Sequence, residues 1–208
     1  MPFIDKHAPQ GLEDLIFVDE TTKQRVGQYA RGERCGNIIF EGPKGTAKST
    51  TARIIADNLI DRSRNDYGVS VYQAADMDEA KIDILQNELH ANKWCGGEKN
   101  YVVIEEVDQL SPRLQRKLRA ILDTNQAGHV IMTTNNVHAV DGPLLDRCDV
   151  IEMPAANMGQ WIDRAREILA KEGVSITDEE LCGLLQTCNG SIRDLLRALE
   201  DYMLAAKQ

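Results

Sequence analysis

The sequence lacks several features that would place it in a membrane, outside the cell or in a disulfide scaffold. No apolar run reaches the length of a membrane-spanning helix. The first ten residues, "MPFIDKHAPQ", lack the charged and then apolar build of a signal peptide. Five cysteines are present without a CxxC pair, which favours free thiols over a disulfide framework or a zinc site. We therefore expect a cytoplasmic (cytosolic) protein without a membrane partner.

Positive charge is also scarce, because 24 Lys and Arg face 33 Asp and Glu, for a net charge of -9. A chain this acidic is not a general nucleic-acid coat, so any DNA contact must come from a local basic patch or from partner subunits. The length of 208 residues suits one domain with a small appendage, and 42% hydrophobic residues are enough for a core.

A phosphate-binding loop is the clearest motif that is present. The apolar run "NIIFE" (37–41) leads into "GPKGTAKS" (42–49), and helical spacing follows. In such a strand–loop–helix context, backbone N–H groups and the helix N-terminus face the phosphates of a nucleotide. Lys48 is expected at the β and γ phosphates and the Ser49 hydroxyl on Mg²⁺. The predicted nucleotide-binding residues are Gly42, Pro43, Lys44, Gly45, Thr46, Ala47, Lys48, Ser49 and Thr50.

Ala47 departs from the pattern G-x-x-x-x-G-K-[ST], which has glycine at this position. Glycine is obligatory only where φ is positive or packing is very close. Because residue 47 stands at the start of a predicted helix, we expect a negative φ and a loop that still binds ATP.

A second motif, "YVVIEEVDQL" (101–110), is an apolar strand that ends in carboxylates. An ATPase of this kind needs one carboxylate near Mg²⁺ and one that positions the attacking water. Adjacent strand residues point to opposite faces, so Glu105 is assigned to the metal, through water, and Glu106 to the water as base. The usual pair is Asp-Glu, and the longer Glu105 predicts that ATP binding survives better than turnover.

The order of elements predicts an α/β fold. Strands are expected near 37–41, 69–74, 101–105, 128–133 and 149–152, with helices near 20–33, 47–60, 78–92 and 111–124. This alternation predicts a P-loop parallel sheet with flanking helices and a ligand at the carboxyl ends of the strands. After Pro154 the pattern is helical only, with a capping box at Thr177 and a cap at Ser191. We expect a nucleotide-binding domain over 1–155 and a small all-helical lid domain over 156–208.

Six blocks of the sequence, in order, resemble one family. They are "FIDKHAPQGLEDLIFVDE", "GPKGTAKSTTAR", "VVIEEVDQLSPRLQRKLRAILD", "VIMTTNN", "PLLDRCDVIEM" and "EGVSITDEELCGLLQTCNGSIRDLLRALE". Together they resemble the small subunits of replication factor C and related clamp loaders, which are AAA+ ATPases. The resemblance implies sensor roles for Asn135 and Arg193, and for Arg147 an arginine finger that acts in trans on the ATP of a neighbouring subunit.

The same resemblance implies a function. An ATP-binding and ATP-hydrolysing subunit would form a ring or spiral with itself or with homologous AAA+ subunits. It would couple ATP and Mg²⁺ to engagement of DNA or a sliding clamp, in DNA replication or repair. Departures from the family pattern are His7, Ala8 and Asp146, and a helical collar domain is expected beyond residue 204 but is not in the sequence.

Two alternatives stay open. Glu105 and the missing collar favour a hydrolytically weak, ATP-binding scaffold or switch subunit. The "TAKS" segment of the loop is similar to MoxR ATPases and favours a protein-remodelling ATPase.

The helix expected at 111–124 is the candidate DNA-binding element. Arg113, Arg116 and Lys117 cluster within about a third of a turn, and no acidic residue intervenes from 111 to 122. Three close cations suit phosphate contacts without sequence readout. A solvated basic face is the alternative, and the basic helix favours DNA over the remodelling hypothesis only weakly.

Overall fold

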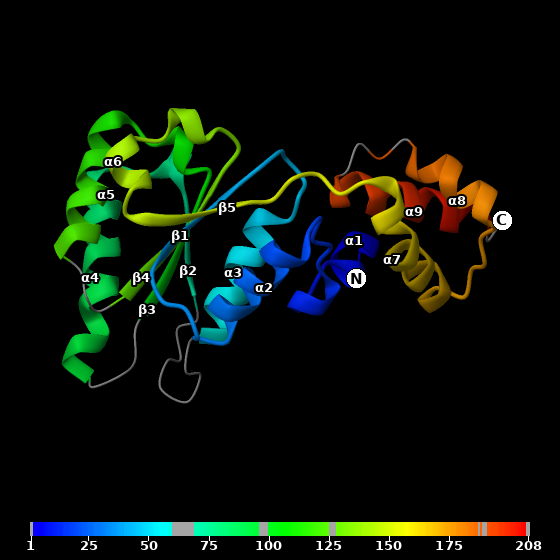
Figure 1. Cartoon of the computed structure of the whole chain (residues 1–208), viewed down its shortest axis with the longest axis horizontal. Coiled ribbons are helices and arrows are strands. Elements are labelled where there is room, and N and C mark those ends of the chain that lie inside the picture. The colour runs from blue at the N-terminus through cyan, green and yellow to red at the C-terminus, as the bar shows by residue number, and fades with distance from the viewer. Residues whose placement is uncertain are drawn as a thin grey trace.

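The computed structural model describes residues 2–59, 69–95, 100–124, 128–186, 188 and 191–206. A sheet with helices on both faces forms one body, and a bundle of helices forms the other. An extended stretch after the last strand connects the two, so that the molecule is elongated (Figure 1).

The sheet of the described chain has five parallel strands in the order β2-β3-β4-β1-β5. This confirms the predicted α/β fold. β1 lies between β4 and β5. Because the strands are parallel, the loop that follows β1 lies at the carboxyl edge of the sheet, where this fold class binds ligands. The strands are β1 (Asn37–Glu41), β2 (Ser70–Gln73), β3 (Asn100–Glu105), β4 (Gly128–Thr134) and β5 (Cys148–Glu152).

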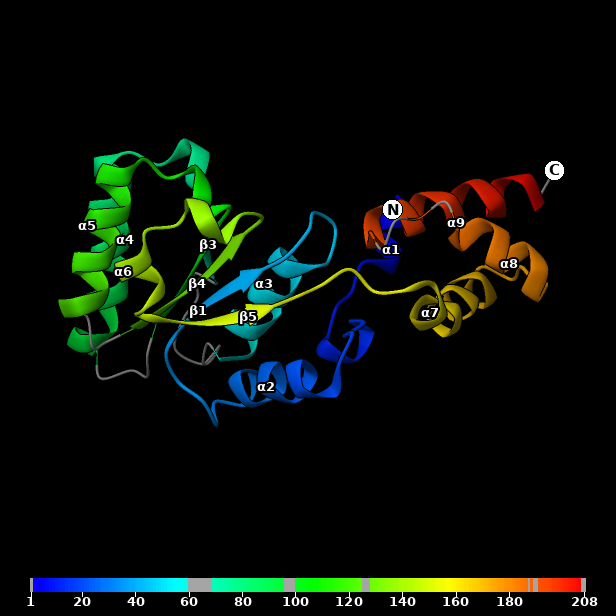
Figure 2. The same cartoon turned by 45° about the horizontal axis from the view of Figure 1, so that its top comes forward.

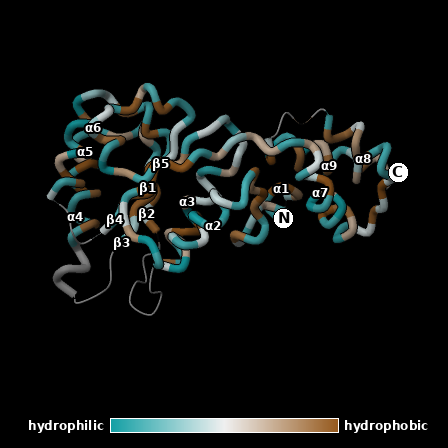
Figure 3. The backbone as a smooth tube through the Cα atoms, viewed as in Figure 1, coloured by the Kyte–Doolittle hydropathy of each residue, from teal (hydrophilic) through white to brown (hydrophobic). Residues whose placement is uncertain are grey.

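The alternation of side chains along β1 divides the core of this body into two layers. Ile38 and Phe40 pack with α2 (Glu20–Ala30) and α3 (Lys48–Leu59) on one face, whereas Ile39 packs on the other face. That second face is covered by α4 (Glu79–Cys95) and α5 (Pro112–Thr124), as Figures 1 and 2 show. Figure 3 shows hydrophobic residues along the strands between these helices.

The second body contains α7 (Met158–Lys171), α8 (Asp178–Leu185) and α9 (Ile192–Ala206). The capping box predicted at Thr177 is confirmed, because its side chain accepts from the Glu180 N–H and Glu180 bonds back to the Thr177 N–H. Ser191 caps α9 by accepting from the Asp194 N–H at 3.3 Å. Gly173 follows the end of α7 with φ of 73°, a conformation that glycine adopts without strain.

The N-terminal segment packs on these lid helices through Phe3 and Ile16, whereas Leu12 and Phe17 pack against the core of the sheet. Phe3 is buried among the lid helices within α1 (Phe3–His7), and Ile16 packs against the same cluster. Lys6 pairs with Glu172 at 2.6 Å. We keep a division of the chain near Pro154 as a proposal, with this N-terminal segment attached to the second unit.

Short elements account for most differences from the sequence-based expectations. The first predicted helix ends at Ala30 and not near 33, and α1 was not expected. A short helix, α6 (Gly142–Leu145), precedes Arg147. Three cysteines, at 35, 148 and 182, are free, and the side chain of Cys95 lies outside the described residues. Over the described ranges no helix has the length and apolar character needed to span a membrane.

Candidate functional site: a pocket at the phosphate-binding loop

The loop after β1 forms one wall of a pocket of about 250 Å³ at the N-terminus of α3. Six of the nine predicted loop residues line it, and three segments from other parts of the chain complete the wall. Its lining consists of Lys44, Gly45, Ala47, Lys48, Ser49, Thr50, Glu106, Thr133, Asn135, Ile192 and Arg193. The structure therefore brings together the loop, the carboxylate after β3, the polar end of β4 and the start of the last lid helix.

Gly42 stands outside this lining but shapes the loop. A Cβ atom there would lie 2.1 Å from the Met153 carbonyl oxygen, and its φ is 152°. Because the chain after β5 passes so close to the loop, only glycine fits at this position. Thr46 and Pro43 also lie off the pocket wall, joined by a hydrogen bond from Thr46 Oγ1 to the Pro43 carbonyl at 3.1 Å.

The expectation of a negative φ at Ala47 is wrong. Its φ is 66°, in the left-handed region, and α3 begins one residue later at Lys48. The loop must turn sharply before the helix can start, and glycine at this place in the motif meets that need without a Cβ penalty. Ala47 therefore adopts the left-handed conformation that the glycine of the pattern would adopt without strain.

Lys48 is the buried cation of the pocket, with 7% of its surface exposed. Its ammonium group donates to the Gly42 carbonyl at 2.7 Å and the Pro43 carbonyl at 2.5 Å. Burial lowers the pKa of Lys48 to about 8, although Asp108 and Glu106 act in the opposite direction. A phosphate group would replace two neutral carbonyls by an anionic partner, so this lysine suits a nucleotide.

Glu106 and Asn135 face each other across the pocket. Asn135 Nδ2 donates to Glu106 Oε1 at 3.5 Å, and Gln109 Nε2 donates to Glu106 Oε2. The backbone of Glu106 has φ of 57°, and its N–H donates to Thr133 Oγ1 at 3.1 Å. This left-handed turn carries the carboxylate away from the line of β3 and into the pocket wall.

Glu105 is placed differently from the expectation that assigned it to Mg²⁺. Both of its carboxylate oxygens are engaged elsewhere, by Arg53 of α3 at 2.6 Å and by Gln73 of β2 at 2.7 Å. Its side chain is largely buried and does not line the pocket. Ser49 and Glu106 lie on the pocket wall and could hold a magnesium ion, since a hydroxyl and a carboxylate are oxygen ligands that Mg²⁺ accepts.

The lid contributes the start of α9 to the pocket. The Ile192 N–H donates to the Gly45 carbonyl at 2.9 Å, and a Cβ atom on Gly45 would lie 2.3 Å from Ser191 Oγ. Arg193, the next residue, lines the pocket. A residue that the sequence assigned to the lid is thus brought to the phosphate-binding loop by a direct backbone contact.

Arg147 is not part of this pocket. It lies after α6 on the surface, where its guanidinium group pairs with Asp123 and not with the adjacent Asp146. A role in trans requires a position outside the pocket of its own subunit, and Arg147 has such a position.

The basic face of α5 exists but is partly neutralised. Arg113 pairs with Glu79 at 2.6 Å and Lys117 with Asp83 at 2.6 Å, both acids being on α4. Arg116 is exposed and forms no ion pair with another described residue. Acids of a different helix, which spacing along α5 could not reveal, therefore offset two of the three cations.

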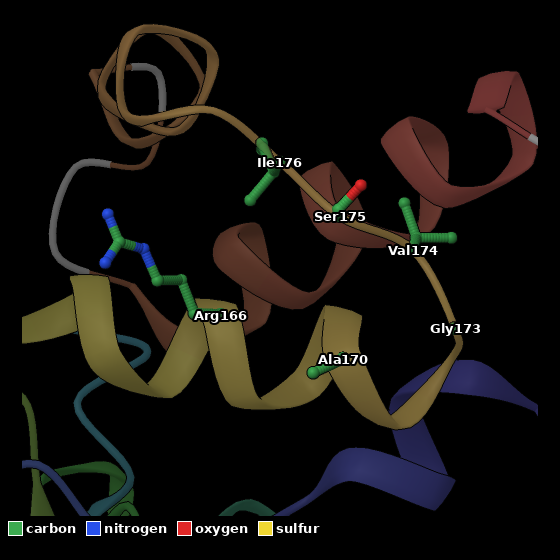
Figure 4. A pocket seen from close by; sticks show the side chains of 6 residues that line it. All are labelled: Arg166, Ala170, Gly173, Val174, Ser175 and Ile176. Carbon is green, nitrogen blue, oxygen red and sulfur yellow. The ribbon is translucent and has the colours of Figure 1, made fainter.

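A second hollow lies in the lid and has a different character. It measures about 420 Å³ and is bordered by α7 and the connection to α8, with Ala170, Val174, Ile176 and Arg166 on its walls (Figure 4). Arg166 pairs with Asp178 beside it. None of the residues predicted to bind nucleotide, metal or DNA lines this hollow, so the loop pocket is the candidate site.

Sequence reasoning missed two residues that organise the loop pocket. Thr133 anchors the backbone of Glu106, and Asp108 accepts from Thr134 Oγ1 at 2.6 Å and from the Asn135 N–H at 3.3 Å. Both lie within quoted motifs, at the carboxyl ends of neighbouring strands. The parallel order of β3 and β4 was the signal that could have joined them.

Comparison with known proteins decides the family. Residues 38–154, more than half of the chain, match the model of the ATPase family associated with various cellular activities (AAA). The chain belongs to this family. The pocket at its phosphate-binding loop is therefore the candidate nucleotide site, and the residues that line it are candidates for the individual roles.

Several curated proteins are similar over nearly the whole chain. They include a probable replication factor C subunit 2 of Dictyostelium discoideum, at 24% identity over 96% of this chain and 60% of that protein. A replication factor C small subunit of Archaeoglobus fulgidus is 26% identical over 95% of this chain and 62% of that protein. The chain thus spans about 60% of the length of these relatives.

The fold is shared with solved structures of lower identity. The Holliday junction branch migration motor RuvB of Thermotoga maritima matches with a TM-score of 0.76 at 18% identity, over 96% of this chain and 65% of that one. Its K64R mutant matches with a TM-score of 0.80 at 17% identity, over 98% and 68%. These matches show that the AAA fold extends through the lid helices.

Proposed function

We propose that this chain is a clamp-loader-like AAA ATPase subunit that assembles with copies of itself or with homologous subunits. In this proposal it couples ATP binding and hydrolysis to the engagement of DNA or a sliding clamp, in replication or repair. The relatives named replication factor C small subunit support this function over the general family.

One observation carries the proposal. The loop, Glu106, Asn135 and Arg193 meet in one pocket, whereas Arg147 lies outside it on the surface. A site that holds phosphates, metal and a base but has no arginine finger of its own needs one from a neighbour. Such an arrangement ties hydrolysis to assembly.

Within the proposed site each residue has a role that follows from its place. Lys48 binds and orients the β and γ phosphates, and Ser49 would hold Mg²⁺, which neutralises charge on those phosphates when bound. Glu106 accepts a proton from the attacking water, and Asn135 orients Glu106 by hydrogen bonding. Arg193 reaches the phosphates from the lid, so that closure of α9 onto Gly45 accompanies binding.

Binding and hydrolysis are tested separately by two substitutions. Lys48→Ala removes the buried ammonium and should abolish ATP binding while the fold, measured by circular dichroism, is kept. Glu106→Gln should leave ATP bound and stop hydrolysis. Undiminished ATP affinity in Lys48→Ala, or undiminished turnover in Glu106→Gln, would contradict these roles.

A weakly hydrolysing scaffold subunit is the second candidate, and the placement of Glu105 favours it. A carboxylate bonded to Arg53 and Gln73 is not available to Mg²⁺ unless both bonds break. If ATP binds tightly but turnover stays near zero with DNA present and across a wide range of protein concentrations, this second function replaces the first.

A further inference from the structure

The guanidinium group of Arg147 is bonded within its own chain through all three of its nitrogen atoms. Nε and Nη2 donate to the two carboxylate oxygens of Asp123, the second at 3.0 Å, and Nη1 donates to the Pro143 carbonyl. Every nitrogen of the group therefore has an acceptor on the same subunit. A planar, two-bond contact of this kind is the strongest geometry that an arginine and a carboxylate adopt.

The contact joins two elements that border the same surface. Asp123 belongs to the last turn of α5. Pro143 lies in α6, and Arg147 is the residue just before β5. A second ion pair, Arg119 to Asp141 at 3.3 Å, links the same two regions. Asp123 and Arg147 remain 45% and 34% exposed, so an approaching subunit could reach the pair.

We propose that Asp123 is a positioning residue that holds Arg147 back on its own subunit until a neighbour's nucleotide competes for the guanidinium group. This inference rests on the proposed trans role of Arg147. The two N–H groups that donate to the carboxylate oxygens of Asp123 cannot at the same time donate to the γ phosphate of a neighbour. Release of Arg147 is therefore a step that assembly must drive, and Asp123 sets its cost.

The size of that cost follows from exposure. Ion pairs on a protein surface contribute little, because water and salt screen them. A bound triphosphate carries more negative charge and lies at an interface that excludes water, so it outcompetes the carboxylate once subunits meet. Asp123 thereby suppresses finger engagement in dilute, unassembled protein without blocking it in the assembly.

The test substitutes Asp123 by asparagine, which has nearly the same shape but no charge. We expect Asp123→Asn to lower the protein concentration of half-maximal ATP turnover by about 1.5- to 5-fold, the range of a surface ion pair. Turnover per subunit at saturating protein concentration should stay equal to that of the unmodified chain. Equal melting temperatures would show that the fold is intact.

Asp146→Asn is the matched control, because Asp146 carries the same charge beside Arg147 but accepts no described hydrogen bond from it. It should shift the half-maximal concentration much less than Asp123→Asn. If both substitutions shift the half-maximal concentration equally, the effect comes from the change of net charge alone and the inference is overturned. A loss of turnover at saturation in Asp123→Asn would also overturn it, since Asp123 would then aim the finger and not restrain it.

Failure of the underlying function has a separate signature. If turnover per subunit of the unmodified chain is independent of concentration and Arg147→Ala is as active, Arg147 has no trans role and Asp123 cannot restrain one. If the unmodified chain depends on concentration and on Arg147 but Asp123→Asn changes nothing, the trans role stands and the restraint is wrong.

Discussion

Ala47 has a left-handed backbone conformation, which is unfavourable for a residue with a Cβ atom. At φ of 66°, an L-residue with a Cβ atom costs about 1–2 kcal/mol more than in a right-handed conformation. Glycine avoids this cost but has a more disordered unfolded chain. We predict that Ala47→Gly raises the free energy of unfolding by up to about 1 kcal/mol.

Chemical denaturation checks this prediction, with Ala120→Gly as the control. Ala120 is an exposed residue inside α5, where glycine should lower the free energy of unfolding by about 0.5–1 kcal/mol. Equal destabilisation by both substitutions would show that residue 47 is not left-handed in solution.

Lys48 makes ATP binding depend on pH. Its pKa is lowered to about 8 by burial, and phosphates beside it would raise the pKa again in the complex. Above pH 8 the free protein must therefore take up a proton in order to bind ATP, and below pH 8 it is already charged. We predict that affinity is nearly constant up to pH 8 and is about 10-fold weaker at pH 9.

Calorimetry in two buffers of different ionisation enthalpy measures that proton uptake directly. We expect close to no uptake by this residue at pH 7 and nearly one proton per nucleotide at pH 9. Affinity that stays constant to pH 9, with no uptake, would place Lys48 away from the phosphates.

Positions of side chains at the site were predictable from the sequence where a motif fixes the backbone. Lys48 and Ser49 follow a glycine loop between a strand and a helix, and the structure places both on the pocket wall. Glu105 was assigned by alternation along a strand, but the partners that engage it come from α3 and from β2. Contacts between distant segments decide such a side chain, and no local pattern contains them.

Helices and strands were predictable to a greater extent, because the hydrophobic period of a long segment indicates both its element type and its buried face. The five strands lie close to the expected ranges, the elements after Pro154 are helices as predicted, and Thr177 and Ser191 cap helix starts as predicted. The short α1 was missed because five residues show no period. Its attachment to the lid depends on Phe3 packing with segments more than 150 residues away.

The basic face of α5 yields a prediction at this scale. Glu79 and Asp83 offset Arg113 and Lys117, so removal of the two acids should strengthen DNA binding if this face contacts phosphates. We expect tighter binding by the double variant Glu79→Gln with Asp83→Asn, measured by fluorescence anisotropy at low salt.

Reversal of the cations is the matched experiment. Glutamate at Arg113, Arg116 and Lys117 should weaken binding and flatten its dependence on salt, because fewer counterions are released. If neither variant changes affinity or salt slope, the face is a solvated surface and DNA contacts lie elsewhere.

At the scale of the whole molecule, two bodies meet at the nucleotide pocket. The lid reaches the loop through Ile192 and Gly45, and the N-terminal segment is fastened to the lid through Phe3 and Glu172. We therefore expect a nucleotide in this pocket to contact both bodies. Arg147 lies on the surface of the first body, outside the pocket of its own subunit, and we propose that it acts on a neighbour.

Subunit mixing tests this account most directly. Glu106→Gln subunits lack the base but keep Arg147, and Arg147→Ala subunits lack the finger but keep the base. Each variant alone should hydrolyse ATP slowly. In a mixture, a Glu106→Gln subunit can supply its finger to the intact base of an Arg147→Ala neighbour, so the account predicts a partial return of turnover that rises with protein concentration. A mixture that stays as inactive as its two components at every concentration would contradict it.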